Sequence, residues 1–280
     1  MQDRNRGLLY ASPLLLWITI FFAVPSAIVV LYSFLERGTY GGVKWNLSFE
    51  AYRNFIDPNF LHVLWITFYI SVAVSIIAIV LALPTAYFIA RSRRRNLLLM
   101  LIIIPFWTNF LIRVYAFIAL LGNNGFVNRG LMEVFGLTEP VQMLYNVGAV
   151  VLITVYTYLP YAILPLYASI EKFDFSLLEA ARDLGASKFQ AMWKVFVPGI
   201  RPGLMTALLF TFIPAMGSYA VPQLVGGKDS MMLGNVIARE LTVTRNWPMA
   251  SAISVVLMAV TAVGIVLFMR YSAREDEHGA

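Results

Sequence analysis

Long apolar blocks alternate with short charged stretches along this chain of 280 residues. A helix needs about 20 mostly apolar residues to cross the roughly 30 Å hydrocarbon core of a bilayer. The blocks predict an all-α integral membrane protein with six transmembrane helices, at residues 8–33, 63–90, 97–121, 147–168, 203–224 and 248–270. The first block follows Arg4 and Arg6, as in a signal peptide, but it is too long and lacks a small-residue cleavage site. We expect it to remain as a span.

Lysines and arginines orient the spans, because cytoplasmic loops are richer in these residues. Thirteen fall on one side of the predicted membrane and seven on the other, and the sequence RSRRR at 91–95 is the densest cluster. The richer side is expected to be cytoplasmic, together with both termini. This arrangement accounts for the net charge of +6 without nucleic acid, and it also fits a composition that is only 13% charged, against about 25% in soluble proteins.

The residues needed for most catalytic sites are missing. The chain has no cysteine and two isolated histidines, His62 and His278, so we expect no metal site. Gly227 and Lys228 lack the glycine spacing of a phosphate-binding loop, and no Ser/His/Asp set is evident. We therefore expect no catalysis and no cofactor in this chain, and an integral membrane enzyme is disfavoured.

The predicted spans contain no Asp or Glu, and their one ionisable group is Arg113. Proton- and sodium-coupled carriers usually place an ionisable group near the middle of the membrane, so a self-sufficient secondary carrier is disfavoured. Asn109 lies one helical turn before Arg113, so both are expected on one face. An unpaired Arg in lipid costs at least about 2.5–3.5 kcal/mol. Two roles stay open: Arg113 reaches the outer headgroups or loop carbonyls, or it faces a transport pathway.

The loop between the fourth and fifth predicted spans, residues 171–202, reads as two short helices joined by a turn. Ser176 and Glu179 have capping-box spacing, and Gly185 is placed to end that helix. Ser187 and Gln190 repeat the spacing and predict a second helix that stops before Pro198. The first helix has an apolar face that packs on the chain's own helices or enters a groove on a cytoplasmic partner; its residues are Leu177, Leu178, Ala181 and Leu184.

This loop resembles the EAA loop of permease subunits of bacterial ABC importers. The resemblance rests on Glu179-Ala180-Ala181, on Gly185 four residues later, and on Val195 and Val197-Pro198, where the family usually has Ile and Leu-Pro. It implies a type I importer fold with a MetI-like core and with cytoplasmic coupling helices between spans four and five. It also implies that the loop docks on an ATPase subunit through residues Glu179, Ala180, Ala181, Asp183, Gly185, Ala186 and Pro198.

Further segments, including PFWTNFLIRVYAF and IPAMGSYAVPQLVGG, resemble the permeases of spermidine/putrescine importers. The resemblance implies import across the bacterial inner membrane. The implied partners are a cytoplasmic ATPase dimer that binds ATP and Mg, a second and different permease chain, a periplasmic binding protein and membrane lipid. One departure concerns the solute: the polyamine members carry acids near the end of the fifth span, where GSYAVPQLVGG has none.

The departure keeps alternatives open for the solute. Aromatic faces can bind ammonium groups, and the second permease could supply acids, so a polyamine remains the leading solute. Another small organic solute, such as an amino acid, an opine or an organic acid, is the alternative, with Arg113 as its counter-ion. The candidate pathway residues are Trp107, Asn109, Arg113, Tyr156, Ser218, Tyr219 and Gln223, with Tyr158 and Tyr161 as further aromatic candidates.

The chain is expected to form one permease domain over 1–280. Within it, residues 1–62 would hold the first span and a periplasmic loop. Residues 63–270 would form the core permease domain with the coupling loop 171–202, and residues 271–280 a cytoplasmic tail.

Overall fold

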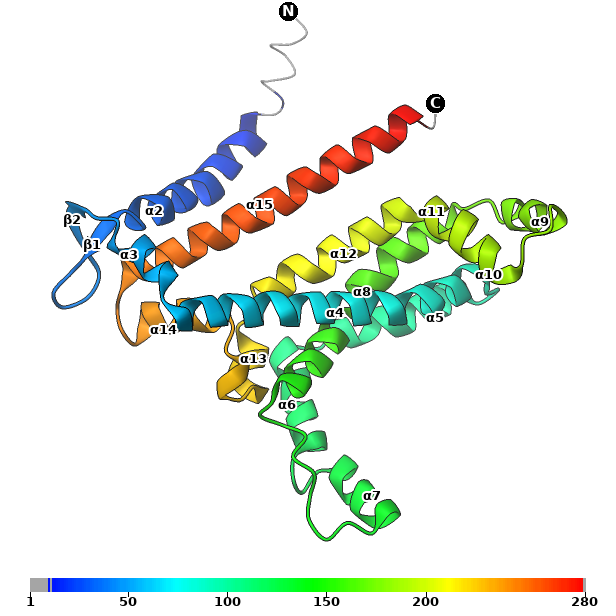
Figure 1. Ribbon diagram of the computed structural model, residues 1–280, viewed down its shortest axis with the longest axis horizontal. Coiled ribbons are helices and arrows are strands. Elements are labelled where there is room, and N and C mark those ends of the chain that lie inside the picture. Colours follow the sequence, from blue (N-terminus) through cyan, green and yellow to red (C-terminus); the bar gives the residue numbers. More distant parts are fainter. Residues whose placement is uncertain (1–9, 11, 279–280) are drawn as a thin grey trace, which may run out of the picture. The chain divides into compact units, whose positions relative to one another are not determined.

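The computed structural model describes residue 10 and residues 12–278 (Figure 1). Arg4, Arg6 and the beginning of the first predicted span lie outside these described residues. The chain is mostly helical and divides into two compact units. One comprises Met1–His62 and Val236–Val260, and the other comprises Val63–Asn235 and Thr261–Ala280.

The first unit contains a helical stretch, Ser12–Tyr32, that includes the π-turn η1 (Thr19–Ala23) and α2 (Val24–Tyr32). A small antiparallel hairpin follows, which the apolar pattern did not predict. Its elements and the next two are β1 (Leu35–Arg37), β2 (Val43–Leu47), α3 (Glu50–Arg53) and the 3₁₀ turn η2 (Asn54–Ile56). The hairpin is held to the stretch before α15 (Trp247–His278), because Nη2 of Arg37 donates to the Thr244 carbonyl oxygen over 2.7 Å.

The second unit contains the remaining helices. In chain order they are α4 (Pro58–Arg91), α5 (Arg95–Ile103), η3 (Ile104–Trp107), α6 (Phe110–Leu121), α7 (Phe126–Phe135), α8 (Val147–Glu171), α9 (Ser176–Asp183), α10 (Lys188–Ala191), η4 (Met192–Phe196), α11 (Val197–Gly199), α12 (Arg201–Met216), α13 (Ala220–Val225), η5 (Lys228–Ser230) and α14 (Leu233–Thr242). By position in the sequence, α4, α14 and α15 each begin in one unit and continue in the other.

Helix α8 lies at the centre of the core of the second unit. Its buried side chains include Val150, Ile153 and Leu166. Helix α12 packs along α8 (Figure 1). The two backbones come close at Gly203, where an added Cβ would lie 2.4 Å from Cβ of Ser169. Glycine is therefore the one residue type that fits this crossing without a shift.

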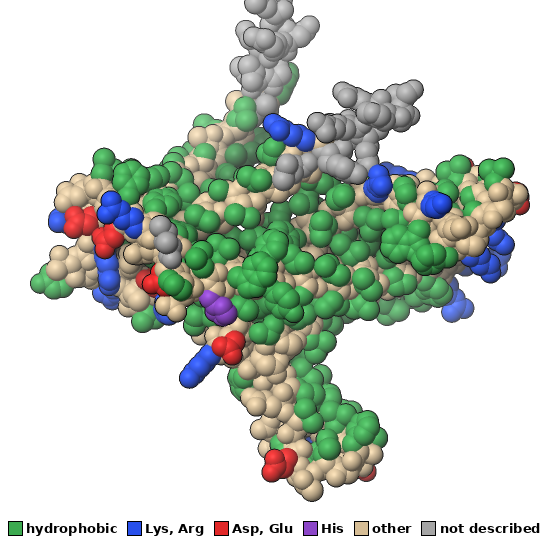
Figure 2. Space-filling model, viewed as in Figure 1, with side chains coloured by type: hydrophobic (Ala, Val, Ile, Leu, Met, Phe, Trp, Pro, Cys, Tyr) green, Lys and Arg blue, Asp and Glu red, His purple; other side chains and the backbone are tan. Residues whose placement is uncertain are grey.

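One face of α4 contributes buried apolar residues to the same core. They recur every four residues, the spacing of one helix face, and they are Ile70, Val74, Ala78, Ala82 and Ala86. The opposite side of α4 exposes large apolar side chains such as Val80 and Phe88. Figure 2 shows apolar side chains spread over the surface of the long helices. A helix with one packed face and one exposed apolar face suits a helix bundle surrounded by lipid.

Four predicted spans are confirmed as long apolar helices. They correspond to Ser12–Tyr32, Pro58–Arg91, Val147–Glu171 and Trp247–Arg270. Within the described part of the chain, five helices are long and apolar enough to cross a bilayer. The number is six if Lys188–Gly199 and Arg201–Met216, bent by 70°, count as one span.

The third predicted span, 97–121, is wrong as a continuous helix. It is broken at Thr108 and Asn109, both of which have extended backbone. Pro105 offers no N–H to a helix, and Oγ1 of Thr108 donates to its carbonyl oxygen over 2.6 Å. Oδ1 of Asn109 then accepts from the N–H of Leu111 over 2.8 Å and caps α6. These polar side chains satisfy backbone groups that a break inside a membrane would otherwise leave unpaired.

The fifth predicted span, 203–224, is also broken. Helix α12 ends at Met216, and α13 begins at Ala220. Gly217 ends the first helix, and the N–H of Ser218 donates to the Ala215 carbonyl oxygen over 3.0 Å. The short connection 217–219 therefore lies between two helices rather than inside one.

Candidate functional site

The loop between α8 and α12 forms the predicted pair of helices, but a different residue caps the first. The predicted capping box of Ser176 and Glu179 is wrong, because the N-cap position makes no side-chain cap bond. Instead, Oδ1 of Asp174 accepts from the N–H of Ser176 over 2.9 Å. These hydrogen bonds hold the pKa of the exposed Asp174 carboxyl below its ordinary value. The side chain of Asp174 therefore caps the first turn of α9 from outside the helix.

Gly185 ends α9 as predicted, with a positive φ of 91°. The N–H of Ala186 donates to the Ala181 carbonyl oxygen over 3.0 Å, and the N–H of Gly185 donates to that of Arg182 over 2.9 Å. This pair of bonds is the Schellman motif, in which the left-handed position favours glycine. The turn sends the chain directly into the next helix.

The second helix begins as predicted and ends later than predicted. The capping box of Ser187 and Gln190 is confirmed, with bonds of 2.9 and 3.2 Å. However, the helix does not stop before Pro198, since it continues through η4 and α11 to Gly199. In the π-turn η4, the N–H of Val197 donates to the Met192 carbonyl oxygen. Pro198 therefore follows a widened helical turn.

The outer surface of this loop exposes apolar side chains beside charged ones. Leu184, Phe189 and Trp193 are 89%, 71% and 59% exposed. Leu177 is half-exposed, whereas Leu178 packs against the core, so the predicted apolar face is divided between the two roles. Figure 2 shows Lys and Arg gathered around the α9–α10 end. A shallow hollow there, lined by Glu179, Arg182, Asp183, Ala186 and Lys188, offers both signs of charge to a partner.

The inner surface of the loop rests on aromatic rings that the sequence analysis missed. Phe196 is fully buried, with ring centroids of Tyr87 and Phe173 at 5.4 and 5.2 Å. Phe175 lies 5.9 Å from Tyr87, and Cζ of Arg91 lies 5.0 Å from the Phe175 ring. In the sequence, the FDF segment at 173–175 was the available signal of this aromatic cluster. The cluster ties the loop to the end of α4.

The remaining coupling candidates lie on this loop. Ala180 and Asp183 are exposed, and Ala181 and Ala186 are partly buried. The carboxylate of Glu179 has no hydrogen bond or ion pair to any residue of the described chain, although it lines the hollow. Pro198 is partly buried at the start of α11.

A second candidate region is a series of contacts between η3, α6, α8 and α12. Cζ of Arg113 lies 4.9 Å from the centroid of Phe106, whose ring lies 5.4 Å from that of Tyr161. Tyr161 lies 6.1 Å from Tyr158, and the Tyr158 hydroxyl donates to the Pro214 carbonyl oxygen over 3.2 Å. The series ends three residues before the break at Gly217. Nε and Nη1 of Arg113 are buried, with no hydrogen-bond partner in the described part of the chain.

Three other pathway candidates occupy different positions. Asn109 was expected on the same helix face as Arg113. Its side chain instead accepts from the backbone of Leu111 and caps α6. Tyr156 packs its ring 4.8 Å from that of Phe117. Trp107 is 86% exposed, and no ring contact joins it to the Arg113 series among the described residues.

The last three pathway candidates surround the break between α12 and α13. Ser218 is buried, while Tyr219 and Gln223 are exposed. Oε1 of Gln223 and the carbonyl oxygen of Tyr219 both accept from Nδ2 of Asn235, over 3.1 and 3.0 Å. Asn235 was not among the predicted site residues. The available signal in the sequence was the segment GNVI at residues 234–237, in which Asn235 follows Gly234.

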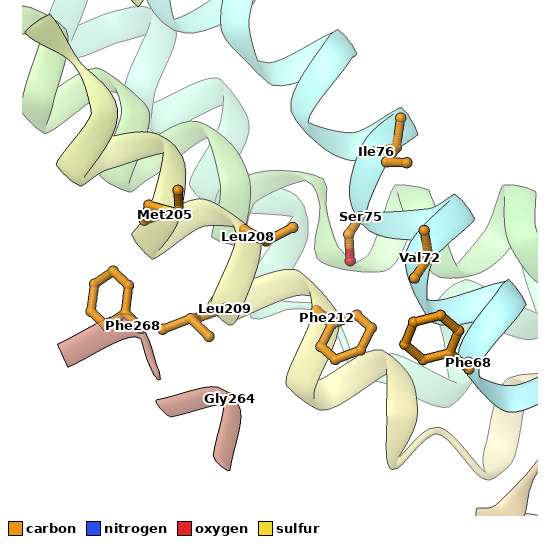
Figure 3. Close-up of a pocket in the computed structure, with 10 residues that line it drawn as sticks. All are labelled: Phe68, Val72, Ser75, Ile76, Met205, Leu208, Leu209, Phe212, Gly264 and Phe268. Atoms are coloured by element: carbon orange, nitrogen blue, oxygen red, sulfur yellow. The ribbon is translucent and has the colours of Figure 1, made fainter. Parts of the chain in front are cut away.

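An apolar hollow of about 460 Å³ lies elsewhere, between α4, α12 and α15. Figure 3 shows Phe68, Leu208, Phe212 and Phe268 around it. Its one hydroxyl, on Ser75, donates to the Ser71 carbonyl oxygen over 2.8 Å. The hollow therefore suits hydrocarbon rather than a charged solute. No group of three or more His, Cys, Asp or Glu side chains that could hold a metal occurs in the described residues.

Comparisons with known proteins identify the fold and the family. Residues 78–274 match the family described as the inner membrane component of binding-protein-dependent transport systems. The chain is 38% identical over 256 residues to the spermidine/putrescine transport system permease protein PotB of Haemophilus influenzae. This match covers 91% of this chain and 90% of the relative. It is 36% identical over 258 residues to PotB of Escherichia coli, covering 91% of this chain and 94% of the relative.

A solved structure agrees with these matches. The bacterial alginate ABC transporter, in complex with an alginate pentasaccharide-bound periplasmic protein, superposes on this chain with a TM-score of 0.73 at 18% identity. The match covers 98% of this chain and 96% of the transporter chain. The predicted permease fold is thereby confirmed. The chain belongs to the family of inner membrane components of binding-protein-dependent transport systems, and it is a multi-pass transport subunit of an ABC importer rather than an enzyme.

Proposed function

We propose that this permease imports a polyamine of the spermidine or putrescine type across the bacterial inner membrane. The observation that carries the proposal is the match along 91% of the chain to two permeases named for spermidine and putrescine transport. The energy comes from ATP hydrolysed, with Mg, on a cytoplasmic ATPase dimer. A second, different permease chain and a periplasmic binding protein complete the assembly.

The coupling loop is the proposed docking site for the ATPase. Its support is the combination of an exposed apolar patch, formed by Leu184, Phe189 and Trp193, with an exposed and unpartnered Glu179 carboxylate. Apolar anchors give affinity to an interface, and a rim charge gives specificity. Glu179 meets a basic group on the ATPase, while Gly185 holds the turn and the small side chains of Ala180, Ala181 and Ala186 allow a close approach. Asp183 and Pro198 flank this surface.

Movement of the loop passes to the spans through the aromatic cluster of Tyr87, Phe173, Phe175 and Phe196. Rings in contact at 5.2–5.9 Å form a packed joint that transmits displacement rather than absorbing it. When the ATPase dimer closes, the loop therefore carries α4 and α8 with it. This motion would alternate the access of the pathway.

The proposed pathway residues are Trp107, Asn109, Arg113, Tyr156, Ser218, Tyr219 and Gln223. Their support is that two breaks interrupt predicted spans, at Thr108–Asn109 and at 217–219, and that both breaks carry polar side chains. Irregular backbone at membrane depth is tolerated where it lines a cavity or is buried in protein. Aromatic faces along the pathway attract ammonium groups.

The proposed orientation places both termini and the coupling loop in the cytoplasm. It rests on the bias of thirteen Lys and Arg residues against seven. One ion pair supports placing the RSRRR turn and the coupling loop on the same side, since Nη1 of Arg95 contacts Oε1 of Glu171 over 2.7 Å at the ends of α5 and α8 nearest the loop.

A second candidate solute is a small organic acid or zwitterion. The predicted spans contain Arg113 and no carboxylate, so they favour a negatively charged group at that point. A secondary carrier that works without an ATPase is a more distant alternative, because these spans offer no acidic site for a coupling ion.

Stimulated ATP hydrolysis tests the proposed solute. The complex of both permeases, the ATPase and the binding protein is placed in nanodiscs, and hydrolysis is measured with spermidine, putrescine, glutamate or no solute. Stimulation by the two amines alone supports the proposal. Stimulation by glutamate alone would replace the polyamine with an anionic solute.

A further inference from the structure

The side chain of Asn235 is almost fully buried, 4% exposed, and uses both of its polar atoms. Its Oδ1 accepts from the N–H of Met232 over 3.2 Å. Its Nδ2 donates to the Tyr219 carbonyl oxygen over 3.0 Å and to the Gln223 side chain over 3.1 Å. One amide thus connects the start of α14 to both ends of the turn that begins α13.

Two of these partners are backbone groups whose polarity is fixed. An N–H can only donate and a carbonyl oxygen can only accept, so the Asn235 amide cannot be flipped without losing both bonds. Its nitrogen must therefore face Gln223. The atom of Gln223 that meets this nitrogen must be the acceptor Oε1, because two amide nitrogens facing each other would pair donor with donor.

The orientation of the Gln223 amide follows from the same chain of contacts. Because Oε1 accepts from Asn235, the polar atom of Gln223 left to bind another group is Nε2, which has two N–H groups. Gln223 is exposed on α13, and Nε2 has no hydrogen bond to another described residue. The segment that carries Asn235 is itself anchored, because the N–H of Leu233 donates to Oγ1 of the buried Thr67 on α4 over 2.9 Å.

We propose that Asn235 makes Gln223 a specificity-determining residue that presents hydrogen-bond donors, and no acceptor, to the solute. The inference rests on the proposed function, in which Gln223 lines the pathway. A protonated amine has donors only, so it cannot bond to Nε2. A solute with a carbonyl or carboxylate oxygen can. Within the polyamine class, Gln223 therefore favours a derivative that also carries an acyl or carboxyl oxygen over the unsubstituted polyamine.

Two single substitutions reverse the polarity at this position in different ways. In Gln223→Glu, one carboxylate oxygen still accepts from Asn235 and the other faces the solute as an acceptor. In Asn235→Asp, the residue at 235 loses its donor, so the Gln223 amide turns its nitrogen toward the new carboxylate and its oxygen outward. Both variants are expected to favour the unsubstituted amine. Gln142→Glu, at an exposed glutamine outside this cluster, is the matched control for added charge.

The test uses spermidine and N1-acetylspermidine, which differ by one acyl group. Uptake of each into proteoliposomes that hold the whole complex gives a ratio of kcat/KM values. The binding protein contributes equally in every variant, so only the change of this ratio between variants is read. We expect Gln223→Glu to shift the ratio toward spermidine by about tenfold, the effect of one charge-assisted hydrogen bond. Asn235→Asp should shift it in the same direction, and Gln142→Glu should leave it unchanged.

The outcomes separate this inference from the proposed function. A working wild-type complex whose ratio is unchanged by Gln223→Glu overturns the inference, even if Asn235→Asp fails to fold. Equal shifts in Gln223→Glu and Gln142→Glu also overturn it, because added charge alone would then explain them. If the wild-type complex imports neither compound and its ATPase is not stimulated, the proposed function has failed instead.

Discussion

The guanidinium carbon of Arg113 lies 4.9 Å from the centre of the Phe106 ring, while Nε and Nη1 are buried without a hydrogen-bond partner in the described chain. Phe106 contacts Tyr161, which precedes Glu171 by ten residues on α8, or about 15 Å. Glu171 pairs with Arg95 at the cytoplasmic end of the proposed orientation. If Glu171 lies at the edge of a roughly 30 Å bilayer core, the proposed orientation puts the guanidinium of Arg113 near the middle of the membrane.

Arg113→Met removes this charge and keeps a long apolar side chain. An unsatisfied buried charge is costly, so we expect the melting temperature of the purified complex to stay the same or rise. Uptake of spermidine should not fall, because a cationic solute gains no favourable contact from a guanidinium, whereas an anionic solute would lose its counter-ion, which Arg113→Lys would keep. A Met variant that melts lower and transports normally would mean that Arg113 serves folding alone.

Gly185→Val should damage coupling more than Gly185→Ala. Space is not the reason, since nothing lies within 4 Å of an added Cβ. The positive φ of 91° costs an L-residue roughly 1–2 kcal/mol, and a β-branched side chain tolerates it less. The measurement is the ratio of solute imported to ATP hydrolysed.

Gly130→Ala is the matched control for this pair. Gly130 also has open space, but it lies inside α7 with an ordinary helical backbone. Alanine there should be neutral or stabilising by about 0.5–1 kcal/mol. Equal and near-normal coupling in all three variants would remove the role assigned to the turn.

Glu179→Lys should release the ATPase from the membrane complex while the permease stays folded. The exposed carboxylate has no partner in the described chain, so its replacement breaks nothing within this subunit, but it places a positive charge against the proposed basic partner. Co-purification of the ATPase with tagged permease measures the effect. Glu133→Lys, the same change on α7, controls for charge. Full retention of the ATPase by the Glu179 variant would argue against docking at this residue.

The cap at Asp174 should make the coupling loop sensitive to acid. Hydrogen bonds from Ser176 hold the pKa of this carboxyl below its ordinary value. Such a group stabilises the fold above its unfolded pKa, about 3.9, and loses the contribution as pH falls through the lower, folded pKa. We expect Asp174→Asn to melt below the wild type above pH 4 and to converge with it as pH falls through the lower, folded pKa. A constant difference across this range would mean that the carboxylate charge is irrelevant.

The sequence predicted the long helices well because apolar length alone identifies them, as in Pro58–Arg91 and Val147–Glu171. It failed at the two breaks. A window of about 20 residues averages over a single Asn109 or Gly217, although one capping side chain or one glycine is enough to end a helix. The hairpin at β1 and β2 was missed for a related reason, since three- and five-residue strands leave little periodic signal.

The candidate sites were predicted unequally. Gly185 and the box of Ser187 and Gln190 follow from local rules, because their partners are within a few residues in sequence. The buried contacts of Tyr87 with Phe196, and of Asn235 with Gln223, join segments that are distant or separated by a break. Spacing along one chain cannot reveal such pairs, so their roles became apparent only in three dimensions.

Uptake of labelled spermidine into proteoliposomes tests the central claim most directly. The complete complex is reconstituted with the binding protein outside, and ATP is either enclosed or omitted. Glu179→Lys provides an uncoupled control in the same vesicles. We predict uptake that requires both enclosed ATP and the binding protein and that is lost in the variant. Uptake of equal rate with and without ATP would contradict an ATP-driven permease.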